Sequence, residues 1–168
     1  MKVLTAEVLG MCFGVRDALQ ILADVERPGE VTIHGELVHN EQVLEQLHAR
    51  GFRMVREEAR RPLPVTPQVM ITAHGVSDVE RRRLQQAGKE LIDTTCPLVT
   101  RVHKAAQALQ EEGYHVVVIG KRGHVEVQGI IEDLHSYDVV GTADEARRYP
   151  HDRLGIVCQT TATARNVT

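Results

Sequence analysis

The chain has little aromatic character. Its 168 residues include no Trp, three Tyr and two Phe, so aromatic residues make up only 3% of the sequence. Unpaired bases usually stack on aromatic side chains, and this composition argues against single-stranded nucleic-acid binding. The 20 Lys and Arg residues are outnumbered by 23 Asp and Glu, for a formal charge of −3. That balance offers no general attraction to nucleic acid or to an anionic membrane.

Targeting segments and common nucleotide motifs are also lacking. No apolar run approaches the ~20 residues of a transmembrane helix, and the acidic Glu7 comes too early for a secretory signal. We therefore expect a cytoplasmic protein. The absence of a GxxxxGK[ST] loop argues against an ATPase, and without GxGxxG nothing supports a nicotinamide cofactor.

Cysteines are few, but two of the three have informative positions. An odd number in a cytoplasmic chain argues against a disulfide framework and favours thiol chemistry, metal ligation or burial. Cys12 and Cys96 each come just before a predicted helix, where the helix dipole favours the thiolate. At an offset of 85 residues in an internal repeat of the chain, Cys158 falls opposite Ala73, and we expect it to be a structural residue packed inside its own lobe.

Short β-branched runs alternate with amphipathic stretches along the chain. This alternation predicts an α/β fold with parallel sheets. A capping-box pattern at Ser77-Asp78-Val79-Glu80 predicts the start of one helix. The stretch 57–68 contains three prolines, the last at Pro67, and we expect it to be an exposed loop. The expected strands are 2–8, 31–34, 69–73, 90–93, 116–119, 138–140 and 154–157, and the expected helices are 13–25, 41–50, 78–87 and 97–112.

The sequence repeats itself at an offset of about 85 residues. Gly35 matches Gly120, and His39 matches His124, while Cys12 and Cys96 differ by 84. Farther along, Met70-Ile71-Thr72-Ala73-His74 matches Ile156-Val157-Cys158-Gln159-Thr160 at an offset of 86. We therefore expect two quasi-repeated parallel α/β lobes, 1–93 and 94–168.

Polar side chains recur where the predicted strands end and the helices begin. Ligands of parallel α/β sheets bind at such ends, so the two lobes could present these residues to a common cleft. Two thiolates suit a soft metal or an iron–sulfur cluster, imidazoles at helix starts suit a phosphate, and a His-x-Glu pair suits proton relay. The set comprises Cys12, His39, His74, Cys96, His124, Glu126 and Thr160.

Six short motifs, taken together, resemble the 4-hydroxy-3-methylbut-2-enyl diphosphate reductase (LytB/IspH) family. The match runs in order over essentially the whole chain. The motifs are Gly10-Met11-Cys12-Phe13-Gly14-Val15, Val38-His39-Asn40, Ala73-His74-Gly75-Val76-Ser77, Asp93-Thr94-Thr95-Cys96-Pro97-Leu98-Val99-Thr100, Gly123-His124-Val125-Glu126-Val127-Gln128-Gly129 and Gln159-Thr160-Thr161.

The resemblance implies an iron–sulfur reductase of the non-mevalonate isoprenoid pathway. Such an enzyme removes the hydroxyl of its allylic diphosphate and gives isopentenyl and dimethylallyl diphosphates. Its [4Fe-4S] cluster has one open iron, and a ferredoxin or flavodoxin type donor supplies electrons. Residue by residue, the resemblance makes Cys12 and Cys96 cluster ligands, His39, His74 and His124 diphosphate ligands, Glu126 part of the proton-delivery network, and Thr160 a residue that orients Glu126 near the substrate hydroxyl.

The family has three lobes, whereas this sequence accounts for two. By the period of the repeat a third cysteine is expected near residue ~180, beyond Thr168. We therefore read the chain as the first two lobes of such an enzyme: a fragment, a truncated product, or one part of a split protein whose third lobe is a separate chain. Two alternatives stay open: a non-catalytic diphosphate- or metal-binding module, and an α/β interaction domain in which the repeat is only architectural.

Overall fold

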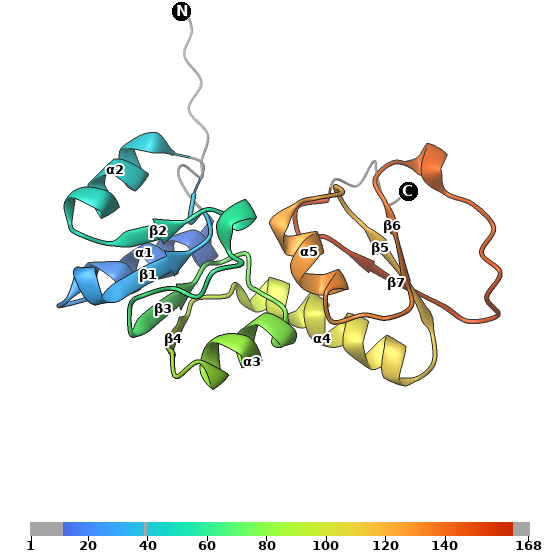
Figure 1. The fold of residues 1–168 in the computed structure, drawn as a ribbon. Coiled ribbons are helices and arrows are strands. Elements are labelled where there is room, and N and C mark those ends of the chain that lie inside the picture. Colours follow the sequence, from blue (N-terminus) through green and yellow to red (C-terminus); the bar gives the residue numbers. More distant parts are fainter. Residues whose placement is uncertain (1–11, 39, 163–168) are drawn as a thin grey trace, which may run out of the picture.

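The structure is a computed structural model that describes residues 12–38 and 40–162. Two separate parallel sheets lie side by side along its long dimension (Figure 1). The first has the strand order β2-β1-β3-β4, with β1 at Val31–His34, β2 at Arg53–Val55, β3 at Gln68–Ile71 and β4 at Glu90–Asp93. The second has the order β6-β5-β7, with β5 at His115–Ile119, β6 at Tyr137–Val140 and β7 at Leu154–Cys158. The predicted α/β fold with parallel sheets is confirmed.

In the described part of the chain, five α-helices connect and cover the strands, and side chains cap three of them. Asn40, Ser77 and His124 each accept a backbone N–H from the first turn of the helix that comes next, which satisfies a donor that the helix itself leaves unpaired. The helices are α1 (Phe13–Ala23), α2 (Glu41–Ala49), α3 (Asp78–Gln86), α4 (Pro97–Glu111) and α5 (Val125–Ile131); short 3-10 turns lie at Pro28–Glu30, Glu57–Ala59 and Ala143–Glu145.

Each sheet has a hydrophobic core of its own. In the first, Ala18 and Leu22 of α1 and Leu47 of α2 pack with Ile33 and Met70 of the sheet. In the second, Ala106 of α4 and Val127 and Ile130 of α5 pack with Val118 and Val157. Helices therefore bury one face of each sheet in the same manner, as the repeat predicts.

Strand pairing corrects one detail of the repeat. Gly35 and Gly120 are equivalent, because their N–H groups donate to Val55 and Val140, the last residues of β2 and β6. However, His34 pairs with Ile71 and Ile119 pairs with Cys158, so β3 and β7 match at an offset of 87 rather than 86. A shift of one residue turns every side chain to the other face. The offset of 87 keeps Met70 and Val157 facing their helices, and it makes Ile71, not Ala73, the counterpart of Cys158.

Other expectations needed smaller corrections. Strand β2 was missed, because its three residues are mostly exposed and lack an apolar alternation. Only half of the predicted capping box forms: Ser77 accepts the N–H of Glu80, but the Glu80 carboxylate pairs elsewhere. The expected strand 2–8 lies outside the described residues. Among those described, no helix is long and apolar enough to cross a membrane.

Candidate active site between the two lobes

Cys12 and Cys96 lie at the starts of α1 and α4. Each is the N-cap residue of its helix, and neither side chain makes a capping hydrogen bond. The two helix starts lie close together: a Cβ added to Gly14 would come within 3.2 Å of the Cys96 Sγ. The backbone N–H of Cys96 donates to the carbonyl of Ala73 at 3.0 Å, just beyond the end of β3. This contact fixes Cys96 beside the segment that carries His74.

His74 and His124 bring the two lobes together. His74 lies beyond the end of β3, and His124 caps α5 in the second sheet unit. Their ring centroids are 5.7 Å apart, with the rings nearly perpendicular. The Nδ1 of His124 accepts the N–H of Glu126 at 3.2 Å. In the neutral ring this acceptor role puts the proton on Nε2, which leaves a donor that suits an anionic ligand.

Glu126 and Thr160 form a two-point contact next to this pair. The Glu126 side chain is almost fully buried, with 1% of its surface exposed. One carboxylate oxygen, Oε1, accepts the backbone N–H of Thr160 at 2.7 Å, and Oε2 accepts the Thr160 hydroxyl at 2.9 Å. Thr160 itself is exposed. A buried carboxylate is thus joined to solvent by a hydroxyl, as a proton relay requires.

The side chain of Gln159 connects the loop at Lys121 with Thr161, next to the Glu126–Thr160 contact. Its Oε1 accepts the N–H of Lys121 at 3.0 Å, and its Nε2 donates to the Thr161 hydroxyl at 2.7 Å. Gly120 makes this close approach possible, because an added Cβ would lie 2.9 Å from the Gln159 Cβ and 2.7 Å from a methyl of Val127. The sequence motif around Thr160 is therefore fixed to the loop before His124.

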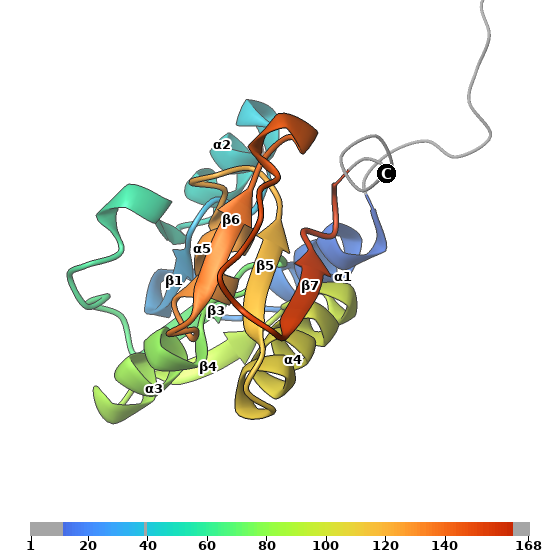
Figure 2. The same ribbon diagram turned by 90° about the vertical axis from the view of Figure 1, so that its right-hand side faces the viewer.

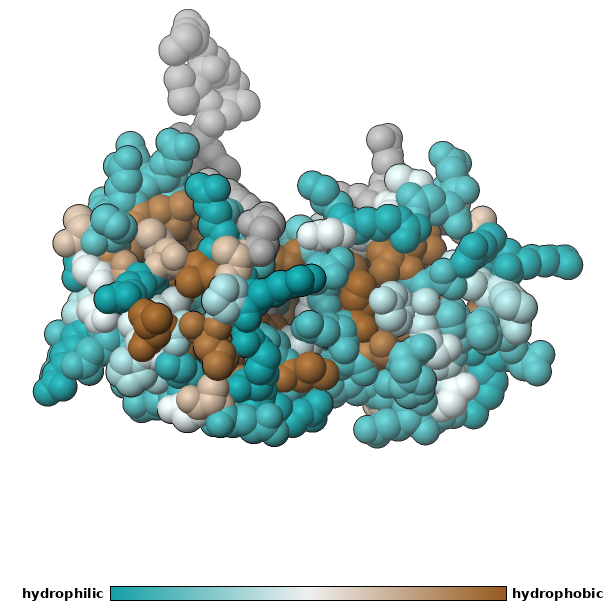
Figure 3. All heavy atoms as spheres, in the orientation of Figure 1, coloured by the Kyte–Doolittle hydropathy of each residue, from teal (hydrophilic) through white to brown (hydrophobic). Residues whose placement is uncertain are grey.

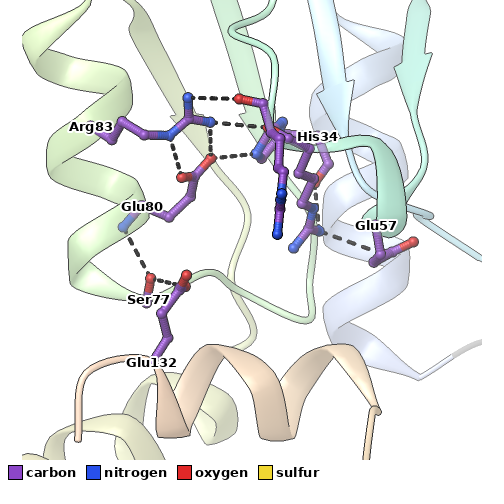
Figure 4. Close-up of polar contacts among 8 residues, drawn as sticks. His34, Glu57, Ser77, Glu80, Arg83 and Glu132 are labelled. Carbon is purple, nitrogen blue, oxygen red and sulfur yellow. Dashed lines mark hydrogen bonds and ion pairs between the residues drawn. The ribbon is translucent and has the colours of Figure 1, made fainter. Parts of the chain in front are cut away.

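A buried polar network lies in the first lobe near the same seam, and sequence reasoning missed it (Figure 4). The fully buried His34 contacts the Glu80 carboxylate at 2.8 Å through Nε2, and Arg83 donates to both oxygens of that carboxylate at 2.6 and 2.7 Å. Burial alone would raise the pKa of Glu80, but the hydrogen bonds and charges of Arg83 and His34 lower it to about 2. The capping-box position of Glu80 was visible in the sequence, whereas its partner 46 residues away was not.

The seam between the lobes is hollowed and lined by both charged and apolar side chains (Figure 3). A cleft of about 740 Å³ runs between the turn at Glu57–Ala59, the first turns of α3, and α5. Arg60, Glu80 and Arg83 line one side, and Gly123, Val125 and Gln128 line the other. The cleft thus reaches the loop that carries His124.

Comparison with known proteins identifies the family. A family model described as LytB protein matches residues 3–168. The chain belongs to the LytB family. It is 34% identical to the 4-hydroxy-3-methylbut-2-enyl diphosphate reductase of Caldanaerobacter subterraneus subsp. tengcongensis, over 96% of this chain and 58% of that protein. It is 37% identical to the enzyme of the same name from Polaromonas sp., over 95% of this chain and 49% of that protein.

Solved structures of LytB relatives have the same fold. A structure of (E)-4-hydroxy-3-methyl-but-2-enyl diphosphate reductase, the terminal enzyme of the non-mevalonate pathway, matches with a TM-score of 0.78 at 34% identity, over 92% of this chain and 57% of the other. The Plasmodium falciparum E-1-hydroxy-2-methyl-but-2-enyl-4-diphosphate reductase matches with a TM-score of 0.75 at 26% identity, over 92% and 48%. The chain spans about half to three fifths of the length of these LytB relatives.

The predicted site residues are only partly accounted for in the structure. Contacts from residue to residue link the start of α1, Cys96, the Ala73–His74 segment, His124, Glu126 and Thr160 along one side of the seam. His39 lies outside the described residues. Cys158 is not packed inside its lobe as expected: it is half-buried at the end of β7, because it lies on the sheet face opposite the helices. Partial burial raises the pKa of its thiol.

The donor set fits part of an iron–sulfur site. Two free thiols at neighbouring helix starts are suitable ligands for iron. Within the described part of the chain, no group of three or more His, Cys, Asp or Glu side chains is arranged to hold a metal ion. Cys12 and Cys96 are therefore two candidate iron ligands, and among the described residues no larger metal-binding group forms around them.

Proposed function

We propose that the chain provides two α/β lobes, 1–93 and 94–168, of a cytoplasmic 4-hydroxy-3-methylbut-2-enyl diphosphate reductase. The reaction would convert this allylic diphosphate to isopentenyl and dimethylallyl diphosphates by reductive loss of its hydroxyl. One observation carries the proposal: His74 and His124, from the two lobes, have ring centroids only 5.7 Å apart, beside the buried Glu126–Thr160 contact.

The diphosphate would bind to the imidazoles. An anion between His74 and His124 would accept hydrogen bonds from both rings, and such bonds are stronger when a partner is charged. His39 is the third imidazole of this proposed set. The cleft of about 740 Å³ lies beside this pair: Gly123 and Val125, which flank His124, line it, and its arginines Arg60 and Arg83 are paired with carboxylates of their own lobe.

Cys12 and Cys96 would hold the iron–sulfur cluster together with a ligand supplied outside this chain. The cluster, with one iron open to substrate, would supply the electrons for the reduction, and a ferredoxin or flavodoxin type protein would reduce it. Helix starts favour the thiolate form that cluster ligation needs. The third ligand is part of the proposal that a third lobe, made of residues outside 1–168, joins these two.

Glu126 would deliver the proton through Thr160. Thr160 is an exposed residue and its hydroxyl is hydrogen-bonded to Glu126 Oε2, so this contact links a buried carboxylate to a residue at the surface. Protonating the substrate hydroxyl makes it leave as water, which is the usual role of a general acid.

The test is anaerobic turnover of the hydroxylated allylic diphosphate with a reduced viologen dye. We expect little or no turnover by residues 1–168 alone, since two cysteines leave the cluster short of ligands, and restored turnover when a third-lobe polypeptide is added. In the restored system Glu126→Gln should lower the rate about 10²-fold or more. Asp138→Asn, which removes a carboxylate paired with His115 and Arg147 away from the cleft, should not.

The other outcomes assign a different function. Robust turnover by the 168-residue chain alone would refute the need for a third lobe and indicate that Cys158 or a dimer supplies the missing ligand. A protein that stays colourless after anaerobic reconstitution yet binds diphosphate would be a binding module, which the incomplete metal-ligand set among the described residues favours as the second candidate. A protein that binds neither cluster nor diphosphate would be an interaction domain.

A further inference from the structure

The carboxylate of Asp133 joins the two lobes. Asp133 lies just beyond α5, and it accepts two backbone N–H groups of α3 in the other lobe: that of Asp78 through Oδ2 at 2.8 Å and that of Val79 through Oδ1 at 3.1 Å. Both are first-turn donors that α3 cannot satisfy itself. A negative charge at this end of a helix is also favoured by the helix dipole. A side chain of the second lobe therefore caps a helix of the first.

Neighbouring residues reinforce this contact. The hydroxyl of Ser77 donates to Glu132 Oε2 at 2.5 Å, which is drawn at the lower left of Figure 4. From α4, the amide of Gln107 donates to Asp78 Oδ2 at 3.0 Å and to Asp133 Oδ2 at 3.2 Å, and so bridges two carboxylates that would otherwise repel each other. We call the contacts of Asp133 and Glu132 with residues 77–79 the lobe clamp.

Close packing leaves little room for movement beside the lobe clamp. Gly129 of α5 lies against α4 and the start of α3: an added Cβ would be 3.2 Å from Cε1 of His103 and 3.7 Å from the N of Ser77. His103 is largely buried, and this burial lowers its pKa. The helix α5 is thus packed closely on α4 of its own lobe and lies in ordinary contact with Ser77 of the other lobe, to which it is also bonded at its end.

The lobe clamp and the imidazole pair lie at opposite ends of α5. His124 precedes the first residue of the helix, and Asp133 comes shortly after the last; seven helical residues span about 10 Å. On the first lobe, His74 precedes Ser77 by only three residues. Both ends of α5 therefore contact one short segment, 74–79. Fixing the far end of the helix to this segment fixes the angle at which the near end brings His124 to His74.

We infer that Asp133 is a positioning residue that holds His74 and His124 at ligand-binding distance. The inference rests on the proposed function, in which these imidazoles bind the diphosphate together. Without the clamp the lobes would sample more arrangements, and only a fraction would keep the imidazoles together. The apparent affinity for a ligand that needs both falls with that fraction.

Two measurements on the 168-residue protein test this. The first is the dissociation constant for inorganic diphosphate by titration calorimetry, and the second is the NMR cross-relaxation between the ring protons of His74 and His124. In Asp133→Ala we expect about tenfold weaker binding and loss of the ring–ring signal. Asp133→Asn keeps one acceptor oxygen and should fall between this variant and the parent. Asp138→Asn is the matched control, because its carboxylate also has two partners but both lie in its own lobe.

Each outcome supports or overturns the inference about Asp133. If Asp133→Ala keeps the ring–ring signal, the inference is overturned, whether or not diphosphate binding weakens, because a purely structural Asp133 would lower the urea midpoint and leave the two rings together. If the signal is lost and the parent binds diphosphate, the inference stands. If the signal is lost but the parent protein binds no diphosphate, the lobe clamp is upheld and the proposed function fails.

Discussion

In the first lobe, Val69 and Ile71 lie on the sheet face that carries His34, and both are fully buried. In the second lobe, the counterpart of Val69 is Ile156, which is 62% exposed, and the counterpart of Ile71 is Cys158, which is half-buried. Figure 2 presents this second face, with β6, β5 and β7 toward the viewer. Helix α3, which comes after β3, sends Glu80 to His34 on the first face. Within residues 12–38 and 40–162, no helix packs on the matching face of β7. The two sheets thus share their strand pairing but differ in the burial of one face, because both faces of a sheet are buried only where helices cover both.

Truncating one side chain in the interior strand β3 and one in the edge strand β7 should give the largest contrast. Ile71→Ala removes a fully buried side chain and should lower the free energy of unfolding by about 3 kcal/mol. Ile156→Ala, on the exposed counterpart face, should change it by less than about 0.5 kcal/mol. Urea unfolding of the two variants measures the difference. Equal losses would mean that the face of β7 is buried in solution, for example against another chain.

The two equivalent glycines should both resist substitution, but for different reasons. Gly120→Ala places a Cβ within 2.7 Å of Val127 and 2.9 Å of Gln159, and such overpacking costs about 2 kcal/mol. Gly35→Ala forces an L residue into a φ of +118°, a strain of about 1–2 kcal/mol, and its Cβ would also clash with the flexible guanidinium end of Arg60. Thermal unfolding gives both losses. Only Gly120→Ala should also broaden or shift the amide NMR signals of Lys121 and Thr161, since it alone displaces Gln159.

The smallest effect should be a pH-dependent one that the second lobe lacks, because the counterpart of His34 there is Ile119. The pKa of Glu80 in the folded protein is about 2, below its ordinary 4.5. Its stabilisation is therefore complete above about pH 4.5 and is lost as the pH falls toward 2. Glu80→Gln keeps the hydrogen-bonding shape and should cost about 1–2 kcal/mol at pH 7. The urea midpoints of the variant and the parent should converge as the pH approaches 2; a constant difference would contradict this.

Much of the fold could be predicted because it depends on local patterns. The strands at Val31–His34 and Glu90–Asp93 and the start of the helix after Ser77 can be inferred from short runs of sequence. The register of β7 could not be obtained in this way. Apolar residues on both faces of β7 allow it to be aligned with β3 at an offset of 86 or of 87. Only the pairing of β7 with β5 shows that the offset is 87.

In the candidate site, too, local sequence patterns could be predicted and contacts across the fold could not. Its thiols, imidazoles and carboxylate were predicted because they recur in register and resemble family motifs. The contacts that hold the lobes together have no such signal: Asp133 caps a helix 54 residues earlier in the chain, and His34 reaches a carboxylate 46 residues away. Side chains that act across a fold depend on tertiary geometry, which spacing in one sequence does not contain.

The two hydrogen bonds between Thr160 and Glu126 are not interchangeable. The backbone N–H at Oε1 can only donate, so a proton that Glu126 shares with Thr160 can lie only in the contact at Oε2. The Thr160 hydroxyl now donates there, and the two groups exchange roles when Glu126 carries the shared proton. The hydroxyl must then accept from the carboxylic acid and turn its own hydrogen away from Glu126. The orientation of one exposed hydroxyl therefore reports whether the buried carboxyl group carries its proton.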